Sequence, residues 1–115
     1  MHGVLASLTT FLGVGIFANT MNATLIVRSK TVTAEGDIIE FVVWRVPVPV
    51  PPSRHDFKYR AAYVVEGKRV VGFDNERGKG DHKHVMGHET VYRFTSVEQM
   101  IEDFISEVDA IRRQR

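Results

Sequence analysis

The sequence predicts one α+β domain, in which an antiparallel sheet of about five strands packs against a C-terminal helix. Residues 23–94 contain runs of Val, Ile, Thr and aromatic residues separated by turns rich in Gly and Asp, a composition typical of strands. Residues 97–111 instead carry apolar side chains at helical spacing. A chain of 115 residues is long enough for one hydrophobic core and too short for two ordinary domains.

Composition excludes several classes of protein. A hydrophobic share of 43% and a charged share of 25% argue against a disordered chain and against a membrane protein. The formal net charge of +1 gives no overall attraction to nucleic acid or anionic lipid. Because the chain has no cysteine, a metal site would need His and carboxylate ligands. We expect a cytoplasmic protein that does not contact a membrane.

Residues 1–20 are set apart from the expected domain at residues 21–115. Residues 4–18 are apolar, but they are fewer than the roughly 20 residues that a spanning helix needs. The segment lacks the basic residues and the cleavage site of a typical signal peptide. We favour an apolar N-terminal extension or a misassigned start over a weak signal-like segment.

The first two strands are expected in residues 23–46, as a hairpin that turns at residues 34–37. Residues 38–44 are apolar on both faces, which indicates a central strand. All four prolines fall in residues 47–52, where they predict a stiff connector within the domain. A proline motif that binds a partner is the alternative.

A second hairpin is expected at residues 57–74, because apolar and polar residues alternate there around a turn at residues 66–67. The alternation predicts that Lys58 and Arg60 point the same way.

Residues 75–89 are polar and rich in glycine, so we expect a long loop followed by a short strand at residues 90–94. Ser96 and Gln99 fit a capping box at the start of the helix.

Residues 73–84 gather most of the polar residue types that enzymes use in catalysis. If residues 81–84 are extended, His82 and His84 lie on one side of the chain, and Asp81 and Lys83 lie on the other. Two imidazoles that face one pocket suit general acid and base catalysis near neutral pH. Asp74 and Asp81 are the carboxylate candidates.

On RNA, one imidazole would remove the 2′-hydroxyl proton while another group protonates the leaving oxygen. Arg60, Lys58 or Lys79 would balance charge on the phosphoryl oxygens, without a metal or other cofactor. Residues 77–80 resemble a backbone anion nest. The candidates for RNA binding are Lys79, Arg77, Arg54, His55 and Lys83.

Two other interpretations of the polar segment remain open. The two histidines, with Asp81 or Asp74, could hold a divalent metal whose bound water acts as the nucleophile. In the other interpretation the segment is a solvated turn without chemistry, in which Asp74 and Asn75 bond their own backbone.

Four segments in order, residues 25–30, 43–47, 53–60 and 74–84, resemble the TumE-like family of small toxins of type II toxin-antitoxin systems. The resemblance extends from residue 23 to about residue 108. It has two departures: Phe73, where a tyrosine is common in the family, and residues 1–20, which have no counterpart. The resemblance implies a toxin made beside a neutralising antitoxin, usually a DNA-binding protein.

The leading hypothesis is therefore a toxin that acts on RNA or translation as a metal-independent endoribonuclease. His82 and His84 would be its acid and base, and Arg60, Lys58 and Lys79 would stabilise phosphate. One alternative is a non-catalytic module that pairs with a DNA-binding antitoxin or blocks translation at the ribosome. A metal-dependent phosphodiesterase is the other.

Overall fold

The computed structural model describes residues 22–114, where six antiparallel strands form one sheet and a helix follows them. The expectation for residues 1–20 lies outside the described residues. The helix is α3 (Val97–Arg113). The strands are β1 (Thr24–Val32), β2 (Ile38–Arg45), β3 (Phe57–Val65), β4 (Lys68–Glu76), β5 (Gly80–Val85) and β6 (His88–Val91).

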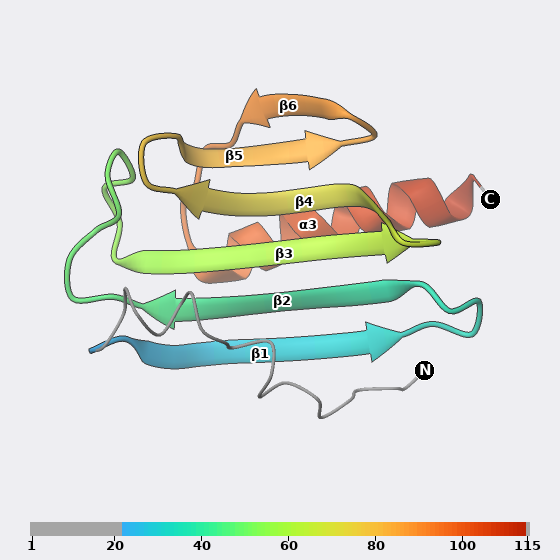
Figure 1. Ribbon diagram of the computed structural model, residues 1–115, viewed down its shortest axis with the longest axis horizontal. Coiled ribbons are helices and arrows are strands. Elements are labelled where there is room, and N and C mark those ends of the chain that lie inside the picture. Colours follow the sequence, from blue (N-terminus) through green and yellow to red (C-terminus); the bar gives the residue numbers. More distant parts are fainter. Residues whose placement is uncertain (1–21, 115) are drawn as a thin grey trace.

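The strands lie in the sheet in their order along the chain, so each strand pairs with its sequence neighbours. Figure 1 shows α3 running behind β3 and β4, and no helix of residues 22–114 lies on the opposite face of the sheet. We call these two surfaces the helix face and the helix-free face. The predicted α+β class is confirmed, with six strands rather than about five.

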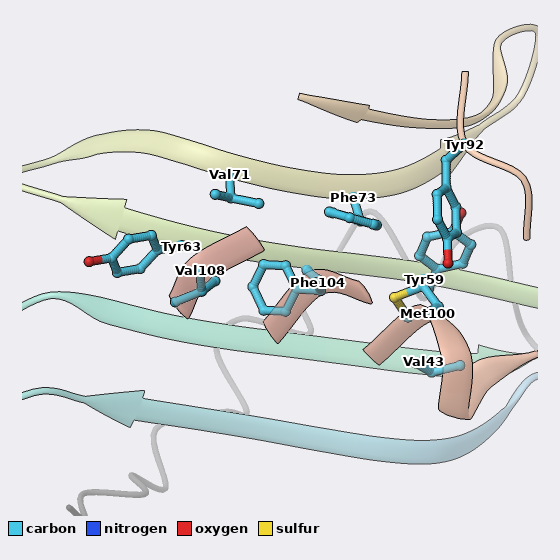
Figure 2. Close-up of a cluster of buried hydrophobic side chains, with 10 residues drawn as sticks. Val43, Tyr59, Tyr63, Val71, Phe73, Tyr92, Met100, Phe104 and Val108 are labelled. Carbon is cyan, nitrogen blue, oxygen red and sulfur yellow. The ribbon is translucent and has the colours of Figure 1, made fainter. Parts of the chain in front are cut away.

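The core lies between the helix face and α3. Met100, Phe104 and Val108 recur along the buried side of the helix and pack against Phe73 and Val71 of β4 (Figure 2). Alternation along the strands directs every second side chain toward this core, so the intervening residues lie on the helix-free face. No helix among residues 22–114 is long and apolar enough to cross a bilayer.

The helix starts where the sequence predicts. The Ser96 hydroxyl accepts a hydrogen bond from the Gln99 backbone N–H at 3.0 Å. The second half of the expected capping box is absent, because the Gln99 side chain donates to Asp103 at 2.8 Å. The cap therefore rests on one side chain, which satisfies one of the free amides of the first turn.

The expected loop at residues 75–89 is wrong. β4 continues to Glu76, and after a tight turn β5 and β6 form a further hairpin. The strand expected at residues 90–94 ends at Val91, although Tyr92 and Phe94 still pack into the core. β5 carries few apolar residues because one of its faces bears histidines and the other bears Lys83, which pairs with Glu107 of α3 at 2.9 Å.

Candidate functional site

Strand register brings three of the expected site residues into one row on the helix-free face. Arg60 of β3 is the partner of Asp74 of β4, and Asp74 is the partner of His82 of β5. Neighbouring strands are about 4.8 Å apart, so the backbones of Arg60 and His82 lie about 10 Å apart. In the next row, His84 is the partner of Glu89 of β6. Both histidines therefore lie on one face, as their spacing predicts.

Both nitrogens of the buried His82 ring lie within 2.9 Å of an oxygen, but only one of the two contacts is a hydrogen bond. Nδ1 lies 2.9 Å from the Gly80 carbonyl oxygen, and because a carbonyl only accepts, Nδ1 carries a proton. Nε2 lies 2.7 Å from Asp74 Oδ1, but the two atoms are not aligned as a hydrogen bond. Asp74 Oδ1 is buried and has no hydrogen-bond partner among the described residues.

Glu89 lies between the two imidazoles. Its carboxylate oxygens are 3.7 Å from His82 Nε2 and 3.7 Å from His84 Nε2. Lys79 Nζ lies 2.7 Å from the same carboxylate, and its hydrogen bond lowers the pKa of Glu89. The same bond raises the pKa of Lys79. One donor atom from each of His82, His84 and Glu89 lies within 4.8 Å of the other two.

Three cations border this cluster. Arg60 lies 3.9 Å from Glu40 and is partly exposed. Arg69 crosses the space that Gly72 leaves open, and its guanidinium lies 4.0 Å from Asp74. Lys58 donates to the Asn75 carbonyl, and burial lowers its pKa. The helix-free face therefore offers positive charge beside the imidazoles.

A groove of about 560 Å³ opens at the end of the sheet next to Lys58. Its polar lining includes Lys58, Glu76 and Arg77, and the connector after β2 supplies Pro47 and Val48. The groove thus places Arg77, in the turn after β4, near Lys58 of β3.

Four other expected site residues do not join the cluster. Asp81 and Lys83 lie on the helix face, and His55 stacks on Phe94 with ring centroids 3.8 Å apart. Arg54 is exposed in the connector between β2 and β3. The structure therefore separates Asp81 and Lys83 from His82 and His84 by the thickness of the sheet.

Asp81 holds the connector to the sheet. Its carboxylate accepts hydrogen bonds from the Ser53 and Tyr59 hydroxyls, at 2.5 and 2.7 Å, and contacts His55 Nε2 at 2.7 Å. Burial by itself would raise the pKa of Asp81, but these hydrogen bonds outweigh it and lower the pKa. The arrangement fixes the chain before β3 and leaves Asp81 no free oxygen for chemistry.

The family model described as Toxin TumE matches residues 14–112, which is most of the chain. The chain belongs to the TumE toxin family. Residues 14–20, expected to have no counterpart, fall within the match. Neither the curated proteins nor the solved structures gave a significant match.

Membership in the TumE family makes an antitoxin partner part of the biology of this chain. Phe73, which stands where a tyrosine is common in the family, lies on the opposite face of the sheet from His82 and His84. Phe73 is fully buried on the helix face, 5.0 Å from the Tyr92 ring and 5.8 Å from the Phe104 ring. A tyrosine hydroxyl at this position would therefore lie on the other side of the sheet from His82.

Sequence reasoning missed Glu89, Arg69 and Arg28 in this TumE-family toxin. Arg28 is the partner of Val42, which extends the row of Arg60 across the sheet. Glu89 is reached only through the pairing of β5 with β6, and residues 75–89, which include all of β5 and the first half of β6, were interpreted as a loop. The available signal was the alternation of charged and polar residues in residues 80–91, which fits strands as well as a loop.

Proposed function

We propose that this toxin cleaves RNA on the helix-free face, with His82 and His84 at the reaction centre. The observation that supports the proposal is the register that sets Arg60, Asp74 and His82 in one row with His84 beside them. A phosphodiester over this row would meet the partly exposed His84 imidazole and the Arg60 guanidinium, with the buried His82 ring next to them. Such a guanidinium stabilises charge that develops on phosphoryl oxygens.

Other cations extend the proposed RNA-binding surface away from the centre. Lys58 precedes Arg60 on the same face of β3, and it also lines the groove that contains Arg77. Lys79 lies beside the centre on the β4–β5 turn, where it pairs with Glu89. These side chains would bind backbone phosphates without reading the base sequence.

The residues of the helix face have no catalytic part in this proposal. Asp81, His55 and Lys83 are engaged in contacts that hold the connector and α3 to the sheet. Arg54 is retained only as an outlying phosphate contact, because it is exposed in the connector.

We also propose a setting for the activity. The family implies an antitoxin, and we propose that it is a DNA-binding protein, as is common for the partners of such toxins. RNA in the cytoplasm would then be the target. A reading frame beside that of the toxin that encodes a small DNA-binding protein would support this part of the proposal.

Cleavage of a fluorescent RNA by the purified chain tests the function. We expect His84→Ala to slow cleavage by about 100-fold or more, because positioned imidazoles contribute roughly that much. Arg60→Ala should slow it by about 10-fold to 100-fold through lost charge stabilisation.

Matched controls separate loss of the centre from general damage. His88→Ala removes an exposed histidine whose partner, Val85, lies on the helix face, and Arg93→Ala removes an exposed arginine beyond β6. Both should cleave like the unaltered chain. Intact RNA with the unaltered chain, or full activity in His84→Ala, would reject the proposal. RNA binding without any product would indicate a non-catalytic module instead.

A further inference from the structure

We infer that His82, His84 and Glu89 bind one divalent transition-metal ion, of the Zn²⁺ or Mn²⁺ class. The positions of the three donor side chains support metal binding whether or not the toxin cleaves RNA. Only the effect of the ion on cleavage rests on the proposed function.

The donor atoms already lie close to the spacing of a coordination shell. Each imidazole Nε2 is 3.7 Å from an oxygen of Glu89, and one atom from each residue lies within 4.8 Å of the others. Ligands that bind an ion tetrahedrally at about 2.1 Å are about 3.4 Å apart. Glu89 is the most exposed member of the set, with 39% of its side chain accessible. Its Oε2 also lies 2.7 Å from Lys79 Nζ, so a bound ion would share this carboxylate with the ammonium or displace it.

The orientation of His82 is that of a metal ligand. Its Nδ1 donates to the Gly80 carbonyl at 2.9 Å, and metal-bound histidines typically donate their second ring nitrogen in this way. The hydrogen bond fixes the ring and directs Nε2 toward Glu89 and His84.

Asp74 supplies an independent observation. The residue is 8% exposed, and its Oδ1 has no hydrogen-bond partner among residues 22–114 although it lies 2.7 Å from His82 Nε2. A buried carboxylate oxygen without a hydrogen bond is costly. A cation held by His82 would lie near this oxygen and offset its charge, although Asp74 is outside the set of three donors.

The donor set selects the class of ion. Two imidazoles with carboxylates suit Zn²⁺, Mn²⁺ and related ions, whereas Mg²⁺ prefers oxygen ligands and water. The ion would add to the positive charge of Lys79 and Arg69, which already lie beside Glu89 and Asp74, and would favour the approach of a phosphate. If the toxin cleaves RNA, the ion would polarise a phosphoryl oxygen of the substrate.

Metal binding is measured on the untagged chain, stripped with chelator, dialysed and titrated with Zn²⁺ and with Mn²⁺ by calorimetry. We expect one ion per chain, and a rise in Tm when the metal is added. His84→Ala and Glu89→Gln should each weaken binding by at least about 10-fold and abolish the rise in Tm. Glu89→Gln keeps the shape of an exposed side chain, so it should fold normally.

His88→Ala is the matched control, because it removes a histidine of β6 that lies outside the cluster. It should bind metal like the unaltered chain. No binding, or equal binding by His84→Ala and Glu89→Gln, overturns the inference. Metal bound without RNA cleavage would reject the proposed function and leave the site standing. Cleavage that persists in chelator, in a chain that binds no metal, would reject the metal site and support the proposed function.

Discussion

Asp74 and Asp81 lie on opposite faces of the sheet, and the face determines which contacts each carboxylate makes. In paired strands β4 and β5, Asp74 is the partner of His82, and Asp81 is the partner of Asn75. Asp81 points to the helix face, where three side chains bind its oxygens. Asp74 points to the helix-free face, where its Oδ1 lacks a hydrogen bond among the described residues. The oxygens of Asp81 are therefore saturated with hydrogen bonds, whereas those of Asp74 have ion-pair contacts with His82 at 2.7 Å and with Arg69 at 4.0 Å.

Replacement of Asp81 should destabilise the whole domain. Asp81→Ala leaves Ser53, His55 and Tyr59 without their shared acceptor, and we expect the free energy of unfolding to fall by on the order of 3 kcal/mol. Urea denaturation measures the loss. Asp56→Ala is the control, because Asp56 is exposed and should change stability by less than about 0.5 kcal/mol. Equal losses in the two variants would refute a tethering role for Asp81.

The sequence predicted the residues of the centre better than their partners. A period of two was enough to set His82 with His84, and Lys58 with Arg60, because it depends only on local extension of the chain. The acceptor role of Asp81 depends on a connector more than 20 residues earlier in the chain, and no local pattern reports such a contact.

At the scale of elements, the β4–β5 turn fixes the position of β5 and hence of His82. Gly78 and Gly80 both have positive φ, at 88° and 77°, a conformation that L side chains adopt at a cost. A Cβ at Gly80 would also lie 3.1 Å from Pro52 Cγ, whereas a Cβ at Gly78 would meet nothing within 4 Å. The Pro51 carbonyl accepts from the Gly78 N–H at 2.9 Å, so the turn packs against the proline connector.

These surroundings predict different costs for two similar substitutions. Gly78→Ala should lower the free energy of unfolding by about 1 kcal/mol through backbone strain alone. Gly80→Ala should cost more, because strain is joined by contact with Pro52. Thermal and urea unfolding of the two variants give the comparison. A Gly80→Ala variant no less stable than Gly78→Ala would show that the contact relaxes freely.

The elements rich in apolar residues were predictable, and the polar ones were not. β1 to β4 and α3 follow from alternation and from helical spacing, because one side of each faces the core. β5 and the first half of β6 bury little apolar surface, so their sequence resembles a loop. Their strand structure comes from hydrogen bonding to β4, which pairing along the sheet supplies and composition does not reveal.

At the scale of the whole molecule, the sheet is a simple meander with α3 against β3 and β4 at its centre. β6 lies at one edge, has four residues and pairs only with β5 within the described chain. All four residues are exposed, and Val91 is 87% exposed. Protection from solvent should therefore fall from the centre of the sheet toward β6.

Hydrogen exchange monitored by mass spectrometry should show this gradient. Amides of β3 and β4 should exchange only on global unfolding, whereas amides of β6 should exchange through local opening at much lower free energy. Peptides covering residues 88–91 and 57–65 allow the comparison. Equal protection of the two peptides would contradict a weakly held edge.

Glu89 belongs to this outermost strand, whereas His82 and His84 belong to the strand inside it. The position of Glu89 therefore depends on a weakly held edge strand, whereas the two histidines lie on a better protected strand. An inhibitor would not have to bind at the histidines themselves. Binding to β6 alone, and moving Glu89 away, would remove the carboxylate that lies between the two imidazoles.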